Sequence, residues 1–174
     1  MNFEKIGPYR VSRVLGQGGM GVVLDALHEQ IGRRAAIKVL HAPLARDAAL
    51  VRRFLNEARS VNLVRHLGLV EIYDYGTLPD GAPYLVMEFL DGECLFDRVA
   101  ARAPLPEREV LLLCAQLADA LAAAHGRGII HRDLKPENIM IIRDPLLPGG
   151  ERVKILDFGI AKLREALEKP GLGG

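Results

Sequence analysis

The residues best suited to chemistry begin with a glycine run at 16–21, with glycines at Gly16, Gly18 and Gly21. Glycines let a backbone pass close to phosphate groups and let its N–H groups point at them. An ordinary glycine-rich turn would look the same, as would a dinucleotide site, which needs a helix after the turn and an acidic residue about 20 positions on. Here residues 22–24 continue as a strand and Lys38 stands near that distance, so a dinucleotide site is disfavoured.

Lys38 is the second candidate, because it lies inside the apolar run 36–40. An unpaired lysine buried in such a run would be unfavourable, so it either points outward from a strand or has a partner. Glu57 lies midway along the helix expected next and could be that partner. A buried Lys–Glu pair facing a phosphate would explain both residues.

A third group occupies residues 131–138, where two carboxylates, a lysine, a histidine and an amide occur together after an apolar pair. A solvated surface loop would also be polar, so the density of these groups is only suggestive by itself. Further along, a strand-like run at 153–156 leads into an Asp-Phe-Gly triplet at 157–159.

The first half of the chain must position these residues on a sheet. Runs of apolar or alternating residues between turn signals predict five antiparallel strands, at 9–15, 22–26, 34–40, 69–75 and 83–89. Between the third and fourth runs the period becomes helical, with Asp47 available as an N-cap. The apolar stripe of this helix consists of Leu50, Phe54, Ala58 and Val61.

The second half of the chain reads first as helical. A short helix is expected at 94–101 and a long one at 106–127, where Leu111 and Leu112 widen the apolar face enough to predict burial on more than one side. Residues 129–142 read as a loop with short strand pieces, and 143–150 as a surface loop rich in proline and glycine. The composition of residues 169–174 is that of a frayed end.

The overall composition narrows the function classes. The chain has 174 residues, of which 49% are hydrophobic and 26% charged, with a net charge of +1. This balance offers no general electrostatic argument for nucleic acid or a membrane surface. Cys94 and Cys114 form neither a disulfide framework nor a zinc site, so we expect structural cysteines and a reduced, cytoplasmic setting. No apolar run approaches the roughly 18 residues of a membrane-spanning helix, and the start is not a signal peptide.

Taken together, the motifs resemble those of protein kinases. In family order and spacing, they are Gly16-x-Gly18-x-x-Gly21-x-Val23, Ala36-x-Lys38, Glu57, His131-Arg132-Asp133-x-Lys135, Asn138 and Asp157-Phe158-Gly159. Lys135 after Asp133 looks like the serine/threonine branch, and residues 17–21 and 84–92 look like its bacterial members. The resemblance implies an α+β, bilobal fold. Residues 1–90 would form an N-lobe with a five-stranded sheet, one helix and a hinge, 91–168 a partial C-lobe, and 169–174 a tail.

The resemblance also implies an activity, the transfer of the ATP γ-phosphate to protein serine or threonine hydroxyls with ATP and Mg²⁺ as cofactors. Lys38 would hold the α- and β-phosphates and pair with Glu57. Asp133 would accept the proton of the substrate hydroxyl, and Lys135 would steady the γ-phosphate. The metal ligands would be Asn138 and Asp157, and the residues that bind ATP would be Leu15, Gly16, Gln17, Gly18, Gly19, Met20, Gly21, Val23, Ala36, Lys38, Met87, Glu88, Leu90 and Met140.

Within that set, the resemblance assigns the adenine contacts to three side chains and two backbone positions. Val23, Ala36 and Met140 would sandwich the ring, the backbone of Glu88 and Leu90 would hydrogen-bond it, and Met87 would gate the pocket behind. An internal support that keeps the lobes aligned would consist of His131, Phe158, Val61 and Ile72.

The chain departs from the family in two ways. The loop at 143–150 is longer than usual, which a surface loop tolerates. More importantly, the chain ends soon after residue 159, without an Ala-Pro-Glu motif or the later helices. We therefore expect part of the long helix to be exposed or covered by a partner. Two alternatives remain, a catalytically inactive ATP-binding or interaction module derived from a kinase and, more weakly, a small-molecule kinase of similar fold.

Overall fold

The computed structural model describes residues 4–157, except for the side chains of Glu57 and Ser60. The contacts divide the chain into two compact units. The first contains the chain up to Ala58 together with Glu71–Phe89, and the second contains Arg59–Val70 and the chain from Leu90 onward.

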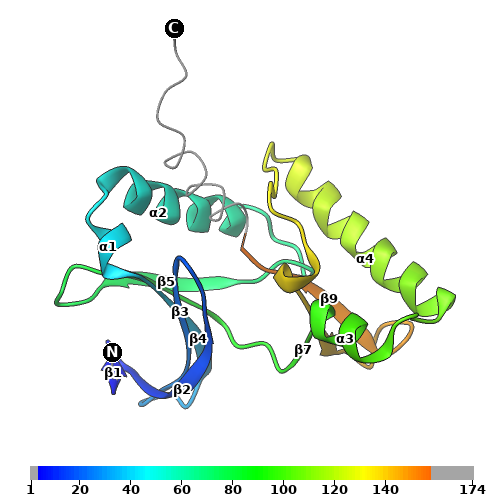
Figure 1. Ribbon diagram of the computed structural model, residues 1–174, viewed down its shortest axis with the longest axis horizontal. Coiled ribbons are helices and arrows are strands. Elements are labelled where there is room, and N and C mark those ends of the chain that lie inside the picture. Colours follow the sequence, from blue (N-terminus) through cyan, green and yellow to red (C-terminus); the bar gives the residue numbers. More distant parts are fainter. Residues whose placement is uncertain (1–3, 158–174) are drawn as a thin grey trace, which may run out of the picture. The chain divides into compact units, whose positions relative to one another are not determined.

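The first unit is built on one antiparallel sheet whose strand order is β1-β2-β3-β4-β6-β5 (Figure 1). Its strands are β1 (Lys5–Ile6), β2 (Tyr9–Gln17), β3 (Gly21–His28), β4 (Arg34–Leu40), β5 (Ile72–Thr77) and β6 (Pro83–Glu88). The expectation of five strands is therefore wrong by one. The extra strand β1 has two residues and pairs with the start of β2 through Ile6 and Tyr9. Gly7, with φ +53°, allows the reversal between them.

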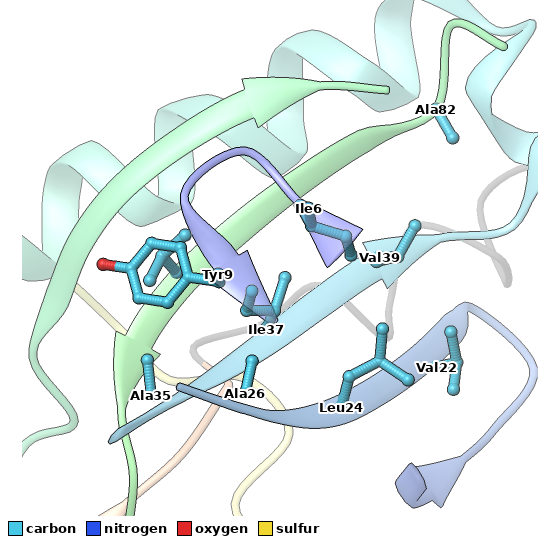
Figure 2. Packing of buried hydrophobic residues seen from close by; sticks show 10 residues of the cluster. Ile6, Tyr9, Val22, Leu24, Ala26, Ala35, Ile37, Val39 and Ala82 are labelled. Atoms are coloured by element: carbon cyan, nitrogen blue, oxygen red, sulfur yellow. The ribbon is translucent and has the colours of Figure 1, made fainter. Parts of the chain in front are cut away.

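One face of this sheet carries its hydrophobic core. Figure 2 shows the side chains of β3 and β4 that point to this face, with Leu24 and Ile37 almost completely buried. Burying an aliphatic side chain of this size contributes about 1.5–3 kcal/mol to stability. Because successive side chains of a strand point to opposite faces, Val23, Ala36 and Lys38 lie on the other face.

Two helices follow β4, α1 (Ala42–Ala45) and α2 (Ala48–Asn62). The short α1 was not expected. In α2 the predicted apolar stripe is confirmed, since all four of its residues are buried: Leu50, Phe54, Ala58 and Val61. The predicted cap is also confirmed, because Asp47 Oδ1 accepts hydrogen bonds from the N–H groups of Ala49 at 2.8 Å and Leu50 at 3.2 Å.

The second unit combines two helices with a three-stranded antiparallel sheet of order β7-β8-β9 (Figure 1). Its elements are α3 (Leu95–Arg102), α4 (Glu107–His125), β7 (Gly92–Cys94), the 3-10 helix η1 (Pro136–Asn138), β8 (Ile139–Arg143) and β9 (Glu151–Ile155). The helices agree with the expected ranges to within two residues. Strand β7 was missed. It pairs with β8 so closely that a Cβ on Gly92 would lie 2.1 Å from the carbonyl oxygen of Ile141.

Helix α4 buries one side, through Leu113, Ala120 and Ala124. On the other side Leu111 is 61% exposed and Cys114 is exposed, counting only the chain up to residue 157. Among the described residues, no helix has both the length and the apolar character needed to cross a bilayer.

Candidate active site

The glycine run forms the turn between β2 and β3, closed by a hydrogen bond from the Gly18 N–H to the Gly21 carbonyl oxygen at 3.0 Å. A Cβ on Gly21 would lie 2.1 Å from the carbonyl oxygen of Val39, so strand pairing requires that glycine. Gly16 and Gly18 are unlike Gly21 in this respect, because a Cβ on either would meet no atom within 4 Å. The protein's own packing therefore does not account for these two glycines, whereas close approach of a phosphate to the backbone would.

His41 holds the same turn from the end of β4. Its backbone N–H donates to the Met20 carbonyl oxygen, and its Nε2 donates to the Gly18 carbonyl oxygen, both at 2.9 Å. Because a carbonyl only accepts, the imidazole proton lies on Nε2. Sequence reasoning missed His41, since a single histidine after a strand carries no signal of what it will contact.

Lys38 is only 8% exposed and lies at the centre of the sheet. It pairs with Val23 on β3 and with Leu85 on β6. A buried ammonium group is stable only with polar or charged partners. The expected partner is Glu57, whose side chain lies outside the described part of the chain.

The end of β6 holds two of the residues expected to bind ATP, Met87 and Glu88. Met87 is opposite Ala36 in the strand register. Glu88 donates its N–H to the Glu71 carbonyl oxygen at 2.9 Å, and its Oε1 accepts from the Glu71 N–H at 2.8 Å. These two bonds fix the backbone of β6 just before residue 90.

In the second unit, Asp133, Lys135 and Asn138 form a compact polar cluster. Asn138 Nδ2 donates to the Asp133 carbonyl oxygen at 2.8 Å and to its Oδ2 at 3.1 Å. Lys135 Nζ lies 3.5 Å from the same Oδ2. The Asp133 side chain is 24% exposed, so the carboxylate is oriented from within the loop and remains accessible from outside.

Buried His131 connects this cluster to the segment that ends in Asp157. Its Nε2 donates to the Leu156 carbonyl oxygen at 2.7 Å, and its Nδ1 accepts from the Asp133 N–H at 3.3 Å. The Leu156 N–H donates to the Asn138 carbonyl oxygen at 2.8 Å. Arg132 and Asp157 have φ values of 61° and 42°, a conformation that costs energy for residues other than glycine. The strain sits beside the polar cluster, where such strain is commonly functional.

The structure thus groups the predicted site residues into two sets. The first unit holds Leu15, Gly16, Gln17, Gly18, Gly19, Met20, Gly21, Val23, Ala36, Lys38, Met87 and Glu88, and the second holds Leu90, Asp133, Lys135, Asn138, Met140 and Asp157. Two residues expected to act with them, Phe158 and Gly159, lie outside the described residues.

The donors expected to hold Mg²⁺ are an amide oxygen and a carboxylate, from Asn138 and Asp157. Ile139 pairs with Ile155 across β8 and β9, which brings the two donors' backbones to the same end of this sheet. No group of three His, Cys, Asp or Glu side chains suited to a metal occurs between residues 4 and 157. Mg²⁺ commonly uses one or two protein ligands together with water and substrate phosphates, so this donor set fits it.

A comparison with protein families matches the protein kinase domain to residues 9–170. The chain therefore belongs to the protein kinase family, and the bilobal kinase fold expected from its motifs is confirmed.

The individual relatives are bacterial serine/threonine-protein kinases. The chain is 49% identical over 162 residues to Pkn1 of Myxococcus xanthus, covering 93% of this chain and 23% of that protein. It is 40% identical over 164 residues to PknA of Mycobacterium tuberculosis, covering 92% of this chain and 37% of that protein. The crystal structure of the Mycobacterium tuberculosis PknI kinase domain matches with a TM-score of 0.74 at 34% identity, covering 90% of this chain and 61% of that one. The chain thus spans well under half of these curated relatives and less than two thirds of the solved domain.

Proposed function

We propose that this chain is the ATP-binding and catalytic part of a serine/threonine protein kinase that transfers the ATP γ-phosphate to protein hydroxyls. The observation that supports this best is the orientation of Asp133. Its Oδ2 accepts a hydrogen bond from the side-chain amide of Asn138 and lies 3.5 Å from Lys135 Nζ. Its Oδ1 has no partner within residues 4–157. An oriented carboxylate with one unengaged oxygen suits the positioning of a substrate hydroxyl.

In the proposed reaction, Asp133 orients the hydroxyl and takes its proton while the hydroxyl oxygen bonds to the γ-phosphorus. The bond from that phosphorus to the β,γ-bridging oxygen breaks, and ADP leaves. Lys135 offsets the negative charge of the phosphoryl group during transfer, and Lys38 holds the α- and β-phosphates with Glu57 as its partner. Mg²⁺, held by Asn138 and Asp157, would supply further neutralisation of phosphate charge.

The ATP-binding residues keep the roles implied by the family. We propose that the turn from Leu15 to Val23 covers the phosphates, that Val23, Ala36 and Met140 contact adenine, and that Met87 lies behind it. The backbone of Glu88 and Leu90 would hydrogen-bond the ring. The exposed backbone at Gly16 and Gly18 supports this proposal, because no other part of the described chain lies within 4 Å of where their side chains would be.

The proposal extends to the domain limits and the setting. Residues 1–90 would be the N-lobe, 91–168 part of the C-lobe and 169–174 a tail, acting in the cytoplasm on protein substrates. Val61 and Ile72, with His131 and Phe158, would support the alignment of the lobes. Val61 is 4% exposed, as such a role requires.

One observation bears on the second candidate, an ATP-binding or interaction module without transferase activity. Helix α4 exposes Leu111 and Val110, at 61% and 40%, when only the described chain is counted. Exposed apolar helix faces commonly bind another polypeptide. A partner covering this face would be compatible with either function.

The two candidates separate in one assay on the chain of 174 residues. ATP binding and transfer of labelled γ-phosphate to casein are measured for the wild type and for Asp133→Asn. Transfer by the wild type that the substitution abolishes, with ATP binding retained, supports a kinase. ATP binding without transfer in either protein supports an ATP-binding module. Absence of ATP binding in the wild type refutes the kinase and leaves only an interaction module.

A further inference from the structure

A row of four side chains crosses the sheet of the first unit beside the residues proposed to contact adenine. Between β2 and β3, Arg13 is opposite Asp25. Between β4 and β6, Ala35 is opposite Glu88, so the next pair along these two strands would be Arg34 and Phe89. Asp25 is two residues from Val23, and Arg34 is two residues from Ala36. Since side chains alternate along a strand, this row shares the face that carries Val23, Ala36 and Lys38.

At the centre of the row, Asp25 and Arg34 are joined as a rigid fork. Arg34 Nε donates to Asp25 Oδ1 at 2.9 Å, and its terminal Nη2 donates to Oδ2 at 2.7 Å. Arg13 Nε adds a third bond to Oδ2 at 3.2 Å. The Asp25 side chain is 5% exposed. Hydrogen bonding to Arg34 is the largest cause that keeps the pKa of Asp25 below its ordinary value, so the carboxylate is ionised at neutral pH.

The fork places the flat guanidinium of Arg34 over the ring of Phe89, 3.5 Å from its centroid. Phe89 follows the last residue of β6 and precedes Leu90. The hydrogen bonds of Glu88 hold the chain on one side of Phe89, and the stacked guanidinium holds the ring itself. The side chain that stands between the two backbone positions proposed to bind adenine is therefore clamped from β3 and β4.

Stability alone does not account for this arrangement. Burial of the Asp25 carboxylate costs desolvation energy, whereas the side chains of Arg34 and Arg13 are 46% and 63% exposed, so water weakens both ion pairs. What a bidentate fork supplies is fixed geometry, because a planar guanidinium bound at two points cannot swing away from the ring.

We propose that Asp25 and Arg34 are positioning residues for adenine recognition, which clamp Phe89 and so hold the Glu88–Phe89 backbone in the geometry that binds the purine. This inference rests on the proposed function, since it names the ligand part that the segment recognises. It requires that substitution of Arg34 weakens binding of the adenine moiety and leaves binding of the triphosphate unchanged.

The first experiment needs no nucleotide. Hydrogen–deuterium exchange is followed for peptides covering residues 85–91 in the wild type, Arg34→Ala, Arg34→Lys and Arg33→Ala. Arg33 is a matched control, because its guanidinium lies over Tyr73, 3.4 Å from the centroid, instead of over Phe89. The clamp predicts faster exchange at 85–91 in both Arg34 variants, since lysine cannot form the fork, and no change there in Arg33→Ala.

The second experiment compares ligands on the same four proteins. Dissociation constants are measured for ATP and for inorganic tripolyphosphate, both with Mg²⁺. For Arg34→Ala we expect ATP binding to weaken about tenfold, within the range set by loss of a partly desolvated cation–π contact, with tripolyphosphate binding unchanged. Arg34→Lys should behave like Arg34→Ala, and Arg33→Ala like the wild type.

The outcomes separate the clamp from the function on which it rests. Equal weakening for both ligands, unchanged exchange in the Arg34 variants, or full rescue by lysine would overturn the clamp. A wild type that binds no ATP would overturn the proposed function, while the exchange data would still decide whether Arg34 holds residues 85–91. If Arg34→Ala does not fold, Arg34→Lys and Phe89→Leu carry the same comparison.

Discussion

Replacing Arg98 by methionine tests how the second unit holds β9, the strand that leads to Asp157. Arg98 lies in α3 and its side chain is 3% exposed. Its guanidinium donates to Glu93 at 2.9 Å, to Glu109 at 3.0 Å and, through two nitrogens, to Glu151 at 2.7 Å. Because Glu151 is the first residue of β9, this cation ties that strand to α3 and α4.

The expected loss of unfolding free energy depends on how exposed the three glutamate partners of Arg98 are. Removing one member of a buried ion pair usually costs about 3–5 kcal/mol, because the remaining charge is left without compensation. Here the three carboxylates are between 24% and 41% exposed and can regain water. We therefore expect Arg98→Met to lower the free energy of unfolding by about 3 kcal/mol, the lower end of that range.

Urea unfolding of the chain at pH 7 measures this loss, with Arg102→Met as the matched control. Arg102 also contacts Glu93, but its side chain is 51% exposed, so its loss should cost less than about 1 kcal/mol. If Arg98→Met costs no more than Arg102→Met, the buried network does not hold the unit together and the reasoning is refuted.

The pH dependence provides a second check. Hydrogen bonding to Arg98 is the main cause that lowers the pKa of Glu151 from its ordinary 4.5. A carboxylate with a depressed folded-state pKa contributes stability that is complete above its unfolded value and is lost as the pH falls through the folded one. The stability difference between wild type and Arg98→Met should therefore be constant near neutral pH and shrink below about pH 4.5.

Three further predictions concern the proposed nucleotide site. Gly18→Ala should leave the melting temperature unchanged, because its Cβ meets no atom, yet weaken ATP binding; Gly21→Ala should lower the melting temperature, since its Cβ would lie 2.1 Å from a strand carbonyl oxygen. Equal effects of the two on stability would contradict this difference. Lys38→Ala or Asp157→Ala should abolish thermal stabilisation by Mg-ATP, and stabilisation retained in both would exclude them from the site. His41→Ala should speed hydrogen exchange at residues 18–21 by removing one of two bonds to that turn, whereas unchanged exchange would show that the backbone bond suffices.

The elements that sequence predicted well are those specified by local patterns. The apolar stripe of α2 and its Asp47 cap follow from helical spacing and from a side chain that bonds its own helix's N–H groups. The glycine run and the 131–138 segment were found because their unusual residue types stand close together in the chain. Strands β1 and β7 were missed, because strands of two or three residues exist only through their pairing partners.

Contacts between residues far apart in the chain could not be predicted from local sequence patterns. Lys154 is one example. It is buried in β9, and its Nζ donates to the Leu69 carbonyl oxygen at 3.3 Å, 85 residues away. His131 is another, since its bond to Leu156 depends on where β9 runs. Residues 59–70 group with the second unit, although their first four residues are the last turn of α2, which begins in the first unit.

The amino-acid sequence by itself determined the family and the catalytic candidates, because phosphate binding and proton transfer need particular residue types at particular spacings. The tertiary structure alone decided how those groups are oriented. Asn138 orients the Asp133 carboxylate. The pairing of β3 with β4 makes Asp25 and Arg34 diagonal neighbours, and the pairing of β4 with β6 places Arg34 over Phe89. The physical reason is that a hydrogen bond or a stacked ring depends on geometry within a few tenths of an ångström, which only the folded chain sets.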